Sequence, residues 1–182
     1  MKLALITTAA VALLAAAPAH AEVKQTWAAG FRLENRATIA AAPDKVWAAL
    51  GQIGKWWNGE HSYSGDSANM TVVLTPGGCF CEALPKGGGV KHGEVVMVMP
   101  GQTLRLEAPL GPLQGEGVGA ALTFTLKATA DGGTEVVETF NIGGARPEIV
   151  GYAAGIDAVV GEQLQRLKAF VETGRPQQGQ TP

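Results

Sequence analysis

The sequence predicts an α+β fold, in which an antiparallel sheet of about seven strands curves around one long C-terminal helix. Short stretches in which apolar and polar residues alternate indicate strands, and 25 glycines and 10 prolines supply many turns. One long apolar stripe with helical spacing starts at Pro147. With 182 residues, of which 46% are hydrophobic and 16% charged, the chain can bury a single core of ordinary size.

Residues 1–21 have the form of a signal peptide. Lys2 gives a positive start, an apolar run covers residues 3–17, and Ala19-His20-Ala21 has the small-x-small pattern of a cleavage site. The apolar run is shorter than the roughly 20 residues that a membrane-spanning helix needs. We therefore expect cleavage after Ala21, no membrane anchor, and a periplasmic or secreted protein.

An N-terminal segment, residues 22–30, precedes the domain expected over residues 31–173. Alternation from Phe31 to Ile39 predicts a strand whose apolar face is interrupted by the polar Asn35. Ala42-Pro43-Asp44 then begins a helix, because proline and an acidic residue are both favoured in a first turn. Gly51 and Gly54 divide that helix into two short pieces, and residues 58–68 are predicted as a loop.

Six further strands are predicted after this loop, over residues 70–74, 79–84, 91–99, 103–107, 120–127 and 134–140. The segment 108–119 contains two prolines and four glycines, which predicts a mobile surface loop. The long helix carries its apolar stripe on Ile149, Tyr152, Ile156, Val160, Leu164, Leu167 and Val171. Residues 174–182 are predicted to form a disordered tail, because they are rich in Gln, Pro and Gly.

Four motifs add a resemblance to a known group: Ala42-Pro43-Asp44-Lys45-Val46-Trp47-Ala48-Ala49-Leu50, Gly54-Lys55-Trp56-Trp57, Pro76-Gly77-Gly78-Cys79-Phe80 and Gly93-Glu94-Val95. With the element order, they resemble the START-like (SRPBCC) superfamily over about residues 31–172. The nearest branch contains polyketide cyclase-like proteins and the ATPase-activating domain of a cochaperone. The resemblance implies a helix-grip fold with a cavity between the sheet and the long helix. Cys79-Phe80-Cys81 departs from it, since relatives often carry basic residues there.

Composition and motifs exclude several functions. The net charge is -2, and no cluster of four or more basic residues is present, which argues against nucleic acid and anionic membranes as partners. No Ser-His-Asp order, phosphate loop or nucleotide fingerprint occurs. The implied cavity predicts a small hydrophobic or aromatic ligand, bound without a cofactor. Two alternatives stay open: a cofactor-free enzyme of the cyclase or hydrolase type, and a protein-interaction domain.

Five residues are candidates for lining this cavity: Trp56, Trp57, Glu138, Tyr152 and Ile156. Trp56 and Trp57 are adjacent, so one can line the cavity while the other packs beneath the first helices; alternatively, both are core aromatics. Glu138 shares a face with Val136 and Phe140 if that apolar face is the inner one, and it lies in solvent if the faces are reversed. Any acid/base catalysis would depend on Glu138, Glu94 and His92, the last two being expected on one face.

Cys79 and Cys81 are the only cysteines. Residues two apart on a regular strand lie about 6.6 Å apart with parallel side chains, which predicts free thiols, although a distorted strand would permit a disulfide. One register of the following hairpin places Cys81 beside His92, where a soft metal could bind. The other register places His92 beside Glu82. Metal binding is the minor expectation, and no metal site is predicted.

Overall fold

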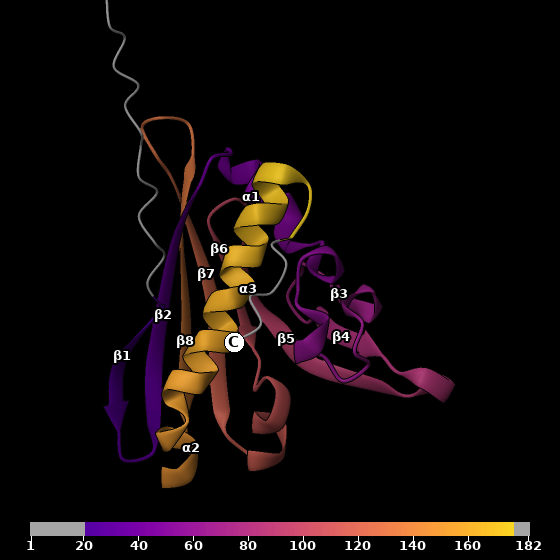
Figure 1. Cartoon of the computed structure of the whole chain (residues 1–182), viewed down its shortest axis with the longest axis vertical. Coiled ribbons are helices and arrows are strands. Elements are labelled where there is room, and N and C mark those ends of the chain that lie inside the picture. Colours follow the sequence, from indigo (N-terminus) through magenta and orange to yellow (C-terminus); the bar gives the residue numbers. More distant parts are fainter. Residues whose placement is uncertain (1–20, 177–182) are drawn as a thin grey trace, which may run out of the picture.

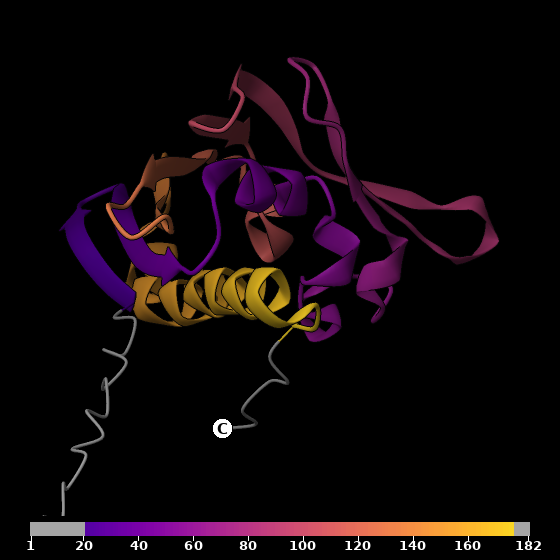
Figure 2. The ribbon, with the colours of Figure 1, turned by 90° about the horizontal axis from the view of Figure 1, so that it is seen from above.

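The computed structural model of this protein describes residues 21–176. The predicted signal peptide, apart from its last residue, therefore lies outside the described residues. Residues 177–182 of the predicted tail also lie outside them. The described chain forms one antiparallel sheet that curves around a long C-terminal helix, as Figures 1 and 2 show. This arrangement confirms the predicted α+β class.

The sheet has eight strands in the order β1-β2-β8-β7-β6-β5-β4-β3. The strands are β1 (Ala21–Trp27), β2 (Gly30–Ile39), β3 (Met70–Val72), β4 (Cys79–Ala83), β5 (Gly89–Met99), β6 (Thr103–Glu107), β7 (Gly119–Ala128) and β8 (Thr134–Gly143). Strands β2 and β8 are adjacent although they are far apart in sequence, because the meander from β3 to β8 returns to the first part of the chain. The hairpin of β4 and β5 projects away from the rest of the sheet (Figure 1).

Strand β1 is the strand that the sequence analysis missed, since it expected only a segment at 22–30. It is an edge strand whose side chains are mostly exposed, so it lacks the alternation that marks a strand with one buried face. Backbone pairing with β2 holds it, from Ala21 opposite Asn35 to Trp27 opposite Gly30. A side chain at Gly30 would collide with the Trp27 ring, which its Cβ would approach to 2.6 Å.

The core lies between the concave face of the sheet and helix α3 (Ala153–Thr173). Leu164 and Leu167 are fully buried there, as the apolar stripe predicted. The predicted single helix from Pro147 is in fact two, because α2 (Pro147–Gly151) ends before Tyr152, whose φ of -91° and ψ of 5° are not helical. The break leaves Tyr152 69% exposed instead of on the buried stripe.

The remaining helices are short and connect the strands. They are α1 (Pro43–Leu50), η1 (Ile53–Lys55), η2 (Gly59–His61), η3 (Ser67–Asn69), η4 (Pro85–Gly87) and η5 (Gly111–Glu116). Helix η5 lies in the predicted loop 108–119, where Leu113 and Val118 are buried. Among residues 21–176, no helix combines the length and the apolar character needed to cross a membrane.

A β-bulge between β4 and β5 decides where two predicted site residues lie. Phe80 pairs with Gly93 and Cys81 with Lys91, so His92 is an extra residue on β5 without a partner on β4. Gly93 has no room for a side chain, because a Cβ there would lie 2.5 Å from that of Ala108. Cys79 opposite Glu94 and Phe80 opposite Gly93 follow the first register considered from the sequence, but the bulge shifts the pairing before Cys81, so His92 lies beside Glu82 and not beside Cys81.

The prediction of free thiols is wrong, because Cys79 and Cys81 form a disulfide. Their Cα atoms are 5.4 Å apart, which is less than the spacing of about 6.6 Å assumed for a regular strand. The bulge opposite Phe80 and Cys81 is the physical reason, since a bulge increases the local twist and a strongly twisted strand is shorter. The disulfide lies on the partly exposed face of β4, opposite to the face of Phe80 and Glu82.

Candidate functional site

A cavity of about 650 Å³ lies between α3, the sheet and two loops. The helical side is formed by Ile149, Tyr152, Gly155, Ile156, Val159 and Val160, and the sheet contributes Phe140 and His92. One loop contributes Trp57, Glu60, His61, Ser62 and Tyr63, and the other contributes Leu110, Gly111, Pro112 and Leu113. Its lining is therefore mostly apolar and aromatic, with a few polar groups.

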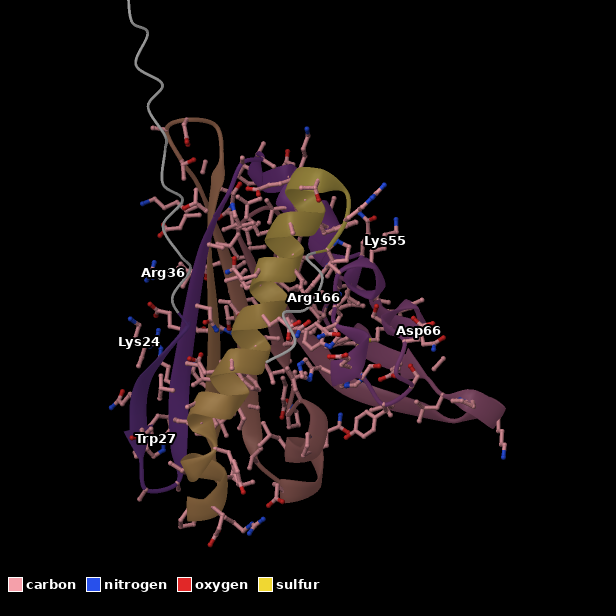
Figure 3. All side chains as sticks on the ribbon, viewed as in Figure 1. Lys24, Trp27, Arg36, Lys55, Asp66 and Arg166 are labelled. Atoms are coloured by element: carbon pink, nitrogen blue, oxygen red, sulfur yellow. A yellow bond between two sulfur atoms is a disulfide. The ribbon has the colours of Figure 1, made fainter. Side chains whose placement is uncertain are left out.

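Helix α3 holds the first of these loops in place by hydrogen bonds to its backbone. Arg166 lies on the side of α3 that faces the segment carrying Lys55 and Asp66 (Figure 3). Its Nε donates to the carbonyl oxygen of Trp56 at 2.8 Å, and its Nη2 donates to that of Trp57 at 3.3 Å. One turn earlier in the helix, Gln163 Oε1 accepts the Asn58 amide at 2.8 Å. Residues 56–58, at the start of this loop, are therefore tied to the helix.

The two adjacent tryptophans have separate positions. Trp56 is 1% exposed and donates its indole N–H to the carbonyl oxygen of Ala49 in α1 at 2.8 Å, so it packs in the core beneath that helix. It borders only a separate apolar void of about 10 Å³, which has room for about one water molecule. Trp57 lines the large cavity and donates to the carbonyl oxygen of His61 at 3.0 Å.

His92 and Glu82 form a buried polar pair at the cavity wall. His92 Nε2 lies 2.7 Å from Glu82 Oε2, and the two residues are 3% and 2% exposed. The bulge turns the His92 side chain onto this face. Its ring packs at a tilt of 35° against Phe80, with the ring centroids 4.9 Å apart, and lies 5.8 Å from the ring of Tyr63. These contacts fix the orientation of the imidazole.

Glu82 is a carboxylate in spite of its burial. Burial acts to raise the pKa of Glu82, but hydrogen bonds from Ser64, Tyr63 and His92 outweigh it, so its pKa lies below its usual value. The amide of Tyr63 donates to Glu82 Oε2 at 3.1 Å, and the amide of Ser64 donates to Oε1. This carboxylate therefore anchors the loop over the cavity as well as the histidine.

A second buried polar cluster lies under α3, outside the cavity lining. Asn35 Nδ2 lies 3.4 Å from both Glu138 Oε2 and Asp157 Oδ1, and Asn35 Oδ1 is buried without a partner. Glu138 faces inward with Val136 and Phe140, so the reversed assignment of faces is excluded. Burial raises its pKa well above the usual value; the Asn35 hydrogen bond opposes this, and the Asp157 charge adds to it.

The structure separates the other predicted acid/base and metal candidates from the cavity. Glu94 lies on the outer face, opposite Cys79, and forms a 2.6 Å ion pair with Lys91, so the expectation that it shares a face with His92 is wrong. The bulge is the reason, because it shifts the alternation by one residue. Cys79 and Cys81 are also on that outer face. Within the described part of the chain, no group of three His, Cys, Asp or Glu could hold a metal ion.

Of the predicted ligand-binding residues, the structure places Trp57, Tyr152 and Ile156 on the cavity, and Trp56 and Glu138 elsewhere. Sequence reasoning named Glu82 only as a neighbour of His92 in one register, not as a site residue, and it missed Tyr63. The glutamate alternates with Phe80 on an apolar face, and this signal could have marked it as an inward carboxylate. Tyr63 lies in a loop without periodicity, where no pattern could place its hydroxyl 3.0 Å from the carbonyl oxygen of Gly111.

Residues 30–172 match the family described as polyketide cyclase / dehydrase and lipid transport. The chain belongs to this family, whose members have a ligand-binding fold, and its resemblance to the START-like superfamily is thereby confirmed. The match includes every strand except β1 and all but the last residue of α3. No curated protein matches the sequence.

Solved structures support the same fold. A conserved protein of unknown function from Enterococcus faecalis, EF2215, is 16% identical, with a TM-score of 0.59 over 86% of this chain and 78% of that one. Aha1 from Colwellia psychrerythraea, solved as a dimer, is 22% identical, with a TM-score of 0.57 over 79% and 97%. CalU16 from Micromonospora echinospora is 17% identical, with a TM-score of 0.53 over 88% and 86%. At these identities the likeness extends to the fold alone.

Proposed function

We propose that this protein binds a small apolar or aromatic molecule in the cavity beneath α3, without a cofactor. The observation that carries the proposal is the cavity itself, whose volume of about 650 Å³ falls within the range of roughly 300–1,000 Å³ typical of small-molecule sites. Its aromatic walls, which include Trp57, Phe140 and Tyr152, match such a ligand. A cavity filled by side chains would instead have favoured a protein-interaction domain.

Binding is favoured over catalysis by the positions of the acid/base candidates. Glu138 is enclosed under α3 and Glu94 points away from the cavity, which leaves His92 as the candidate on the cavity wall. A reaction of the cyclase or hydrolase type also needs a group that stabilises developing negative charge. The lysines and arginines among the described residues do not line this cavity, and the Ser62 and Tyr63 hydroxyls that do line it already donate to backbone carbonyl oxygens.

Filling the cavity tests the binding proposal. Gly155 lines the cavity, and nothing lies within 4 Å of a Cβ built on it, so Gly155→Trp can place an indole in this space without a backbone clash. We expect the variant to bind 1-methoxynaphthalene at least about tenfold more weakly than the wild type, measured by calorimetric titration. Ala154→Trp is the matched control, because Ala154 is exposed on the same helix, as Gly155 is, but does not line the cavity. Equal affinity in the wild type and both variants, or no binding to the wild type, would count against the cavity as the site.

We also propose that the protein is exported and loses residues 1–21. The leader pattern ending at Ala21 supports export, and so does the disulfide, since such bonds persist mainly in oxidising compartments. We expect the intact mass of exported protein, alkylated without reductant, to equal that of a chain starting at Glu22 less two hydrogens. A mass that fits a chain starting at another residue would disprove the processing site. Alkylated cysteines at the expected length would disprove the disulfide alone.

A further inference from the structure

The pair of His92 and Glu82 supplies the cavity with a hydrogen-bond acceptor of fixed position. Glu82 receives hydrogen bonds from the Tyr63 and Ser64 amides, and a carboxylate with such donors can only accept. The proton between Glu82 Oε2 and His92 Nε2 therefore resides on Nε2. In the neutral imidazole, this tautomer leaves Nδ1 as an acceptor with its lone pair in the ring plane.

Nothing else in the described residues uses this acceptor. The hydrogen bonds of His92 to that part of the chain involve Nε2 alone. The buried side-chain atom without a partner there is Asn35 Oδ1, so His92 Nδ1 is not sealed inside the protein. His92 is 3% exposed and lines the cavity, so we infer that a ligand would reach Nδ1 from the cavity.

The other polar side chains of the cavity are engaged or solvated. The Tyr63 hydroxyl donates to the Gly111 carbonyl oxygen at 3.0 Å, and Ser62 Oγ donates to that of Gly59 at 2.7 Å. His61 Nε2 lies 3.3 Å from Glu162 Oε2. Glu60 and Tyr152 are exposed, so water solvates the carboxylate of the one and the hydroxyl of the other. His92 is consequently the buried polar group that a ligand can satisfy.

We propose that the cavity selects aromatic ligands that carry a hydroxyl group, and that this hydroxyl donates its proton to a hydrogen bond with His92 Nδ1. The proposal rests on the proposed function, because it specifies the ligand class of the same cavity. The aromatic walls contact the ring system, and the fixed imidazole recognises the phenolic O–H. Glu82 is the positioning residue, since it holds the tautomer.

A matched pair of probes tests this selectivity. 1-Naphthol and 1-methoxynaphthalene share the ring system, but only the naphthol can donate a hydrogen bond. We expect wild-type protein to bind 1-naphthol about tenfold more tightly than the ether in calorimetric titrations, which is the effect of one net hydrogen bond. In His92→Phe, which keeps a ring against Phe80, the two affinities should become equal while binding of the ether persists.

The control variant is Glu94→Gln, on the outer face of the same strand, which should keep the preference. Equal affinities in the wild type, or a preference that survives in His92→Phe, would overturn the role of His92 while leaving the cavity as a binding site. If the wild type binds neither probe, the proposed function and this inference are both overturned. Should His92→Phe not fold, nitrogen-15 NMR of the wild type decides: the Nδ1 signal of His92 should move with 1-naphthol and not with the ether.

Discussion

Leu164→Ala is expected to lower the free energy of unfolding by about 3 to 5 kcal/mol, because truncating a buried leucine loses its transfer free energy and leaves a void. Leu164 is fully buried where α3 packs on the sheet, in a close-packed part of the core that cannot collapse to fill the space. Urea unfolding followed by circular dichroism measures the effect. A loss of this size is a large part of the stability of a domain of this length.

Ile156→Ala is the matched comparison on the same helix. Ile156 is half-buried and lines the cavity, so its truncation enlarges an existing space and should cost only about 1 kcal/mol. Equal losses in the two variants would contradict the division of α3 into a packed part and a part that borders the cavity. The comparison therefore also tests the position of the cavity by a measurement that needs no ligand.

Glu138→Gln is expected to remove a pH dependence of stability. Burial raises the folded-state pKa of Glu138 well above its ordinary value of 4.5, with the Asn35 hydrogen bond opposing and the Asp157 charge adding to the shift. Between the unfolded and folded pKa values, the folded protein binds more protons than the unfolded chain. The contribution of Glu138 to stability is therefore fully present below about pH 4.5 and is lost as the pH rises through the folded pKa.

The free energy of unfolding of Glu138→Gln should depend less on pH, since glutamine does not titrate. The variant should therefore gain stability relative to the wild type as the pH is raised. Urea unfolding at several pH values from about 5 to 9 gives the slope of the free energy of unfolding against pH for the variant and for the wild type. Glu135→Gln is the control, because Glu135 lies on the same strand with its side chain 39% exposed and paired with Arg36. That control should keep the wild-type slope. A wild-type slope in Glu138→Gln would show that this carboxyl is not the group responsible.

The pattern of residues along the chain is sufficient to determine most strands, the long helix and their inner faces. Alternation from Phe31 to Ile39 places Asn35 on the apolar face, and the structure buries it there. The stripe on α3 likewise identifies Leu164 and Leu167 as core residues. Both inferences succeed because the periods of strand and helix are local properties of the backbone, so the sequence alone decides which side chains share a face.

The tertiary structure decided three features: strand β1, the disulfide, and the pair of His92 with Glu82. The exposed β1 is held by backbone hydrogen bonds, which any side chain except proline leaves possible, so no residue pattern marks it. The disulfide and the position of the His92 side chain both depend on one extra residue in β5. The place of that residue is determined by how β5 pairs with β4 and by how closely Gly93 approaches Ala108. A shift of one residue moves a side chain to the other face of a sheet, and pairing between strands determines that shift.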